Sequence, residues 1–91
     1  MNTLEEYRKE IDLIDKELIN LFEKRMEVVR KVGEYKKENN LEILNVKREE
    51  EVIEKNINNL KNEKYKDAGR KLFEKIMKLS RELQENLVKE K

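Results

Sequence analysis

The stretch LFEKRMEVVRKVGEYKK, residues 21–37, decides the fold. Its apolar side chains recur every three or four residues, which is the spacing of one face of an α-helix. The same pattern begins at Leu4, directly after a T-x-x-E capping box at residues 3–6. No strong helix breaker follows before Asn39 and Asn40, which tolerate the left-handed backbone that ends helices. The sequence therefore predicts one very long first helix.

Two shorter amphipathic helices are expected downstream, the second helix capped by Asn45 and the third by Asp67. Each carries an apolar face: Val52, Ile53, Ile57 and Leu60 on the second helix, and Leu72, Phe73, Ile76, Met77, Leu83 and Leu87 on the third. Gly33 lies inside the first helix and is expected to permit a close helix contact rather than to end the helix. The predicted fold class is all-α, with three helices per chain.

The composition excludes several kinds of chemistry. The 91 residues contain no cysteine and no histidine, which removes thiol nucleophiles, disulfides, zinc sites and imidazole catalysis, and we expect no cofactor and no metal. Charged residues make up 47% of the chain but sum to a net charge of +1, which does not favour nucleic acid or a membrane as partner. We expect a single domain over residues 1–91, located in the cytoplasm.

The length of the first helix implies a partner. About 35 residues at ~1.5 Å each form a rod of roughly 50 Å, whereas a compact chain of this size has a radius of gyration near ~12 Å. Two shorter helices cannot cover such a rod. Its remaining apolar stripe is expected to be buried against a second copy in an intertwined two-fold homodimer.

Charged residues interrupt the apolar face of the first helix. In steps of three and four, this face reads Arg8, Ile11, Asp15, Leu18, Phe22, Arg25, Val29, Val32, Lys36. A buried cation needs an anion or a path to water. One explanation is that the cation stems lie along apolar surface with their tips in solvent. The other is that the cations line a binding site, and the pattern alone leaves both open.

Ser80 and Gln84 interrupt the apolar face of the third helix in the same way, although backbone or water can also satisfy a core Ser or Gln. Cations and an amide on apolar walls suit a small dianion. Arg25 and Lys36 are separated by about 16 Å of helix rise, so both long side chains can reach one small molecule. Arg8 lies about 25 Å from Arg25, so it reaches such a pocket only from an antiparallel partner chain.

The sequence resembles the all-α chorismate mutase family nearly from end to end. The resemblance is carried by three segments: YRKEIDLIDKELINLFEKR at 7–25, KVGEYKKENNLEILNVKREEE at 31–51, and FEKIMKLSRELQ at 73–84. Within them, R-x2-I-D-x2-D at 8–15, VGEYK, the KRE at 47–49 and the Ser80/Gln84 pair are the most specific. The resemblance implies an enzyme that converts chorismate to prephenate in phenylalanine and tyrosine biosynthesis, the last part of the shikimate pathway. It also implies an intertwined homodimer with two active sites.

The family's functional residues carry over by position. The resemblance implies that Arg25 and Arg8 of the partner chain hold the two carboxylates of the substrate. Lys36 is then expected to contact a carboxylate and the ether oxygen, and Gln84 to donate a second hydrogen bond to that oxygen. Glu49 is expected to bind the ring hydroxyl.

The remaining polar lining is expected to come from Arg48, Ser80 and Asn45. Many relatives have Asp where this chain has Asn45, which weakens any claim that a carboxylate is needed there. Asn still caps a helix. Asp12 and Asp15 are interpreted as structural charges rather than catalytic ones.

Two other functions stay open on the sequence. One is an isochorismate–pyruvate lyase of the same fold, which has a similar cationic pocket. The other is a non-enzymatic helical dimerisation module whose charges set the register. Family members are often fused to other enzymes of the pathway, and the terminal LVKEK, residues 87–91, favours a free-standing chain.

Overall fold

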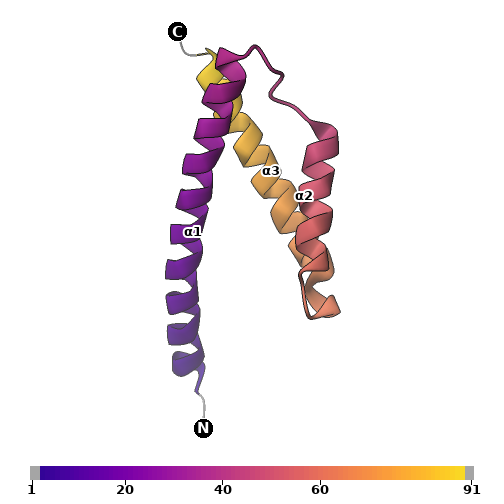
Figure 1. Ribbon diagram of the computed structural model, residues 1–91. Helices are drawn as coiled ribbons and strands as arrows, with labels where there is room; N and C mark the ends of the chain where they lie inside the picture. Colours follow the sequence, from indigo (N-terminus) through magenta and orange to yellow (C-terminus); the bar gives the residue numbers. More distant parts are fainter. Residues whose placement is uncertain (1–2, 90–91) are drawn as a thin grey trace.

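The computed structural model describes residues 3–89 and consists of three α-helices and one 3-10 turn (Figure 1). The elements are α1 (Leu4–Glu38), α2 (Val46–Asn58), η1 (Glu63–Tyr65) and α3 (Lys66–Lys89). Within the described residues there is no strand, so the predicted all-α fold with a very long first helix is confirmed. The terminal segment LVKEK, on which the expectation of a free-standing chain rests, lies partly outside the described residues.

The ends of α1 follow the local signals in the sequence. At the start, the Thr3 side chain accepts a hydrogen bond from the backbone N–H of Glu6 at 3.2 Å. At the other end, Asn39 caps the helix and Asn40 adopts a φ of 55°, the left-handed conformation that turns the chain away. The predicted bounds of this helix are therefore confirmed.

The caps of the two later helices divide into one correct and one wrong prediction. Asn45 caps α2, because its side chain accepts from the backbone N–H of Arg48 at 3.0 Å. Asp67 does not cap the third helix. Asn62 instead caps η1, which runs directly into α3, so Asp67 lies in the first turn of α3, 3.5 Å from Lys71 Nζ. Acidic residues favour the cap and the first turn alike, so the sequence signal was displaced by one short turn.

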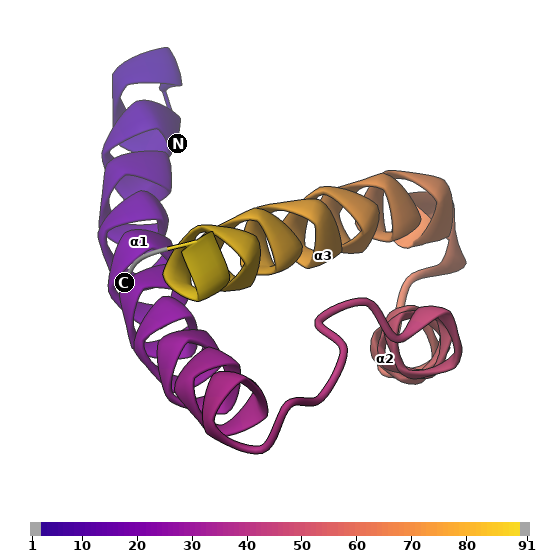
Figure 2. The same cartoon turned by 90° about the horizontal axis from the view of Figure 1, so that it is seen from above.

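The central helix is α3, which packs against both α1 and α2 (Figures 1 and 2). Between α2 and α3 lies the small core, in which Ile53, Ile57 and Met77 are buried. Four partly buried side chains pack around these three: Val52, Leu60, Phe73, Ile76. The predicted apolar face of the second helix is therefore confirmed, and the core is built mainly without α1.

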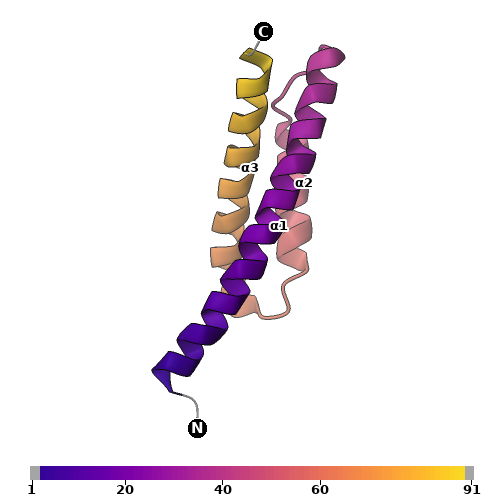
Figure 3. The same ribbon diagram turned by 90° about the vertical axis from the view of Figure 1, so that its left-hand side faces the viewer.

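The first half of α1 projects beyond the other helices (Figure 3). The chain measures 57 × 26 × 14 Å, and its radius of gyration of 16.5 Å exceeds the value expected for a compact chain. Every residue from 3 to 21 is exposed. Exposed apolar side chains on this half are Leu4, Tyr7, Ile11, Leu13, Ile14, Leu18, Ile19, Leu21. As predicted, α2 and α3 leave most of the apolar stripe of α1 uncovered.

None of the helices within residues 3–89 combines the length and apolar character that a membrane span requires.

Candidate active site

A cavity of about 330 Å³ lies between the second half of α1 and the facing sides of α2 and α3. Its volume falls in the range of pockets that hold small molecules. The lining residues are Arg25, Val28, Val29, Val32, Lys36, Ile43, Asn45, Arg48, Glu49, Val52, Met77, Ser80, Arg81, Gln84. Apolar walls therefore surround four cations, one carboxylate and two side-chain amides.

Arg25 enters the cavity from α1 and is fixed there by α3. Its Nη1 donates to Ser80 Oγ at 2.9 Å, and the Ser80 hydroxyl in turn donates to the carbonyl of Ile76 at 2.8 Å. Burial lowers the pKa of Arg25, and repulsion from the Arg48 guanidinium lowers it further. Both effects disfavour the charged form, so an anion in the cavity would relieve them.

Lys36 lies on α1 near its end, where the chain turns into the loop that leads to α2. Its Nζ donates to the backbone carbonyl of Ile43 at 3.0 Å. An ammonium has three donors, so two remain for a ligand. The loop therefore holds the ammonium group at the cavity without using up its capacity.

Gln84 is buried, with 7% of the residue exposed, and lies on α3 opposite α1. Its Nε2 donates to the carbonyl of Val29 at 3.0 Å, which leaves the second amide hydrogen available. Gly33 makes this approach of α3 to α1 possible, because a Cβ there would lie 2.9 Å from Gln84 Cγ and 3.0 Å from Leu87 Cδ1. The role predicted for Gly33 is confirmed.

Glu49 and Asn45 reach the cavity from the start of α2. Glu49 Oε2 accepts from Nε of Arg81 on α3 at 3.0 Å, and both side chains are partly buried. Asn45 lines the cavity while its side-chain oxygen caps the helix. The helix cap and the site therefore share one residue.

The structure brings together most of the residues that the sequence singled out. Those that line the cavity are Arg25, Lys36, Asn45, Arg48, Glu49, Ser80 and Gln84. Arg8 does not line it; this residue lies on the exposed first half of α1. Its predicted contribution concerns the site of a second copy.

Sequence reasoning missed Arg81. It lies outside the apolar face that was counted for the third helix, although it is adjacent to Ser80 and three residues before Gln84. On a helix, residues three apart share a side, so a cation at this spacing from Gln84 was the available signal.

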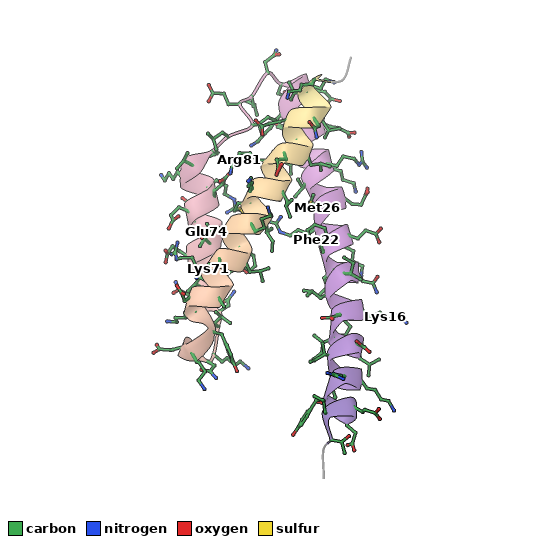
Figure 4. All side chains as sticks on the ribbon, turned by 180° about the vertical axis from the view of Figure 1, so that it is seen from behind. Lys16, Phe22, Met26, Lys71, Glu74 and Arg81 are labelled. Atoms are coloured by element: carbon green, nitrogen blue, oxygen red, sulfur yellow. The ribbon has the colours of Figure 1, made fainter. Side chains whose placement is uncertain are left out.

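A second, apolar hollow of about 510 Å³ lies between α1 and α3. Its lining residues are Asp15, Leu18, Ile19, Leu21, Phe22, Arg25, Leu72, Lys75, Ile76, Leu79. Phe22 lies on the part of α1 that faces α3 (Figure 4). Arg25 lines both hollows, so this apolar groove adjoins the cationic cavity.

The fold and the cavity define the class: a small all-α protein with an apolar-walled pocket that four cations line. The family model for chorismate mutase type II matches residues 7–85, well over half of the chain. The chain therefore belongs to the chorismate mutase type II family.

Two curated relatives are similar to part of the chain. A bifunctional chorismate mutase/prephenate dehydratase from Aquifex aeolicus is 44% identical over 55 residues, which is 60% of this chain and 15% of the relative. The T-protein of Haemophilus influenzae is 47% identical over 49 residues, which is 54% of this chain and 13% of the relative. The chain thus matches less than a sixth of the length of either relative. No solved structure matches it significantly.

Proposed function

We propose that this chain is a chorismate mutase, which converts chorismate to prephenate by an intramolecular [3,3] rearrangement. The observation that carries the proposal is the gathering of Arg25, Lys36 and Gln84 at one apolar-walled cavity in a chain of this family. The reaction transfers no atom to or from the protein. It needs no nucleophile and no general base, which agrees with a chain without cysteine or histidine.

Orientation of the substrate is the first task of the site. Chorismate is a flexible dianion and reacts only from a chair-like conformer. Arg25 would bind one carboxylate, and Arg8 of the partner subunit would bind the other. Two such charge-assisted contacts hold the reacting carbons near each other, so part of the entropic barrier is overcome on binding. The hydrogen bond from Arg25 to Ser80 supports this role, because it fixes the guanidinium before the ligand arrives.

Stabilisation of the breaking C–O bond is the second task. Negative charge grows on the ether oxygen in the transition state, and Lys36 and Gln84 would donate to it. A preorganised donor at a developing oxyanion contributes about 2.7–4 kcal/mol, which is a hundredfold to a thousandfold in rate. The bonds of these two side chains to the carbonyls of Ile43 and Val29 support this role, since they hold both donors in place.

The other polar lining residues would complete recognition. Glu49 would accept a hydrogen bond from the ring hydroxyl, and Arg48, Ser80 and Asn45 would provide the remaining polar wall. We place the whole catalytic unit in one domain over residues 1–91 and the enzyme in the cytoplasm.

The proposed enzyme is an intertwined homodimer. Two observations support it: the exposed apolar half of α1, and the apolar groove between α1 and α3. The cavity itself is open where Val28 and Val32 line it, because these residues are 57% and 42% exposed. The first half of α1 from a second copy would close this opening and bring Arg8 to the site.

Loss of chorismate absorbance on addition of the purified protein tests the function directly. We expect saturable turnover to prephenate without any added metal or cofactor. Isochorismate offered in a parallel assay separates the mutase from a lyase that releases pyruvate. No turnover of chorismate by a folded dimer would refute the proposal.

A further inference from the structure

An ion pair crosses the wall of the cavity from α3 to α2. Arg81 Nε donates to Glu49 Oε2 at 3.0 Å, with 33% and 24% of the two side chains exposed. Arg81 lies on α3 (Figure 4), and both residues line the cavity. Glu49 is the only carboxylate among the lining residues of this cavity. The pair therefore decides where the single negative charge of the wall lies.

Two other ion pairs, both made by Arg70, also link α2 to α3, so Arg81 does not make the only link between these helices in the described residues. Arg70 on α3 binds Glu50 and Glu54 on α2, and none of these three residues lines the cavity. Their side chains are 34%, 57% and 50% exposed, so Glu49 is the most buried of the three glutamates that pair between α2 and α3. The Arg70 pair serves as a matched control for an effect on helix packing alone.

The geometry leaves one oxygen of Glu49 unused. Within residues 3–89, Glu49 Oε1 accepts no hydrogen bond, whereas Oε2 is bound by Arg81. A carboxylate held at one oxygen has a fixed orientation and presents the other oxygen as an acceptor. Without Arg81, the Glu49 carboxylate would be free to rotate, and Oε1 would no longer be held in one direction as an acceptor for a ligand in the cavity.

We propose that Arg81 is a positioning residue. It holds Glu49 by Oε2 and directs Oε1 to the ring hydroxyl of the substrate. The inference rests on the proposed function, because the hydroxyl belongs to chorismate. Arg81 itself contacts no reacting atom in this scheme.

The test compares Arg81→Met with the wild type on two substrates, chorismate and an analogue that lacks the ring hydroxyl. On chorismate we expect kcat/KM to fall about tenfold to a hundredfold, the range of one hydrogen bond to a charged group. A contact to the hydroxyl is made equally in the ground state and the transition state, so the loss should lie mainly in KM. On the analogue, the two proteins should differ by less than about threefold.

Two further variants separate positioning from packing. Arg81→Lys keeps the charge and should recover part of the lost kcat/KM. Arg70→Met removes the other bridge between α2 and α3 and should retain wild-type kinetics even where the melting temperature falls. If Arg81→Met does not fold, the lysine variant carries the same two-substrate comparison.

The outcomes are distinct. An equal loss on both substrates, or no loss on chorismate, overturns the role of Arg81. A wild-type protein that turns over neither substrate refutes the proposed function instead. A loss confined to chorismate, with recovery by lysine, supports the positioning role.

Discussion

Arg25 lines the cavity, but its burial and the nearby Arg48 make its charge unfavourable for the stability of the fold. Its pKa is lowered by burial and by the Arg48 guanidinium, so the charged form is less favourable in the folded chain than in the unfolded one. An arginine does not lose its proton in the working range, so the folded protein retains this unfavourable charge. The hydrogen bond to Ser80 offsets part of it.

Arg25→Met should therefore abolish function without weakening the fold. We expect kcat/KM for chorismate to fall at least a hundredfold while the melting temperature stays within about 4–8 °C of the wild type, which corresponds to about 1 kcal/mol in a domain of this size. Kinetics and a thermal melt of the same preparation measure both.

Arg30→Met is the matched control on the same helix. Its exposed guanidinium pairs with Glu27 and Glu34, and these carboxylates raise the pKa of Arg30. The charged form is favoured there, so its removal should lower the melting temperature slightly and leave turnover intact. A strongly destabilised Arg25→Met protein beside a stable Arg30→Met protein would contradict this assignment of charges.

Lys36 and Gln84 should control turnover rather than folding. We expect Lys36→Met and Gln84→Ala each to lower kcat about a hundredfold to a thousandfold, because each removes a donor to the developing oxyanion. The far-ultraviolet circular dichroism should stay helical. Lys37→Met is the control: Lys37 is the next residue on α1, donates to the carbonyl of Leu87 outside the cavity, and should be dispensable for turnover. Near-normal kcat in both site variants would refute the two roles.

At the residue scale, a charge or amide that breaks an apolar period marked candidate site residues, and the family resemblance gave them roles. Arg25, Lys36, Ser80 and Gln84 were marked in this way and line the cavity, whereas Arg8 and Asp15 break the same period and do not line it. Arg81 was missed because it was not counted on the apolar face of the third helix, although its spacing from Gln84 was a signal; its contact follows from a long side chain that reaches across to Glu49. Such reach depends on how the helices are spaced, which a single helix pattern does not contain.

At the scale of elements, two glycines allow close helix contacts: Gly33 between α1 and α3, and Gly69 between α3 and the end of α2. Gly33 lies beneath Gln84 at the cavity, and Gly69 on α3 faces Leu60 and Ile57 in the core. A Cβ at Gly69 would lie 2.9 Å from Leu60 Cδ1, so the nearest contact is as short as at Gly33, although the next neighbour is 3.3 Å away rather than 3.0 Å. The two glycines differ in which side chain an added Cβ would displace: Gln84, which lines the cavity, or Leu60, which does not.

Gly33→Ala should thus damage activity more than Gly69→Ala does. Each change gains about 1 kcal/mol of helix propensity and loses about 1–3 kcal/mol to overpacking, so both proteins should be at most modestly destabilised. We expect kcat to fall about tenfold in Gly33→Ala, because Gln84 is displaced, and to stay near the wild-type value in Gly69→Ala. Equal kinetics in two folded variants would show that Gln84 tolerates the shift.

The elements themselves were largely predictable because their signals are local. Thr3, Asn40 and Asn45 mark helix ends by their own side chains or backbone, and the structure places the ends there. The cap predicted for α3, Asp67, was wrong because Asn62 caps a short 3-10 turn that leads into the helix. The sequence distinguishes poorly between a helix cap and an acidic residue in the first turn.

At the scale of the molecule, α1 is too long for α2 and α3 of the same chain to cover it. Its exposed first half carries both apolar side chains and Arg8, and the cavity in its second half is open at Val28 and Val32. A two-fold partner would bury the exposed half of α1 and close the open cavity in the same interface, since each α1 would cover the cavity of the other chain. The site would then draw Arg25 from one chain and Arg8 from the other.

This shared site is tested by mixing two inactive variants, Arg8→Ala and Arg25→Ala. After subunit exchange, one site of each heterodimer holds both arginines from intact chains, so activity should reappear. With equal mixing, half of the dimers are heterodimers with one intact site, so about a quarter of wild-type activity is expected. Exchange is confirmed by native mass spectrometry of chains of different mass. Heterodimers without activity would mean that Arg8 and Arg25 must come from the same chain. An Arg8→Ala protein that is active before mixing would mean that Arg8 takes no part in the reaction.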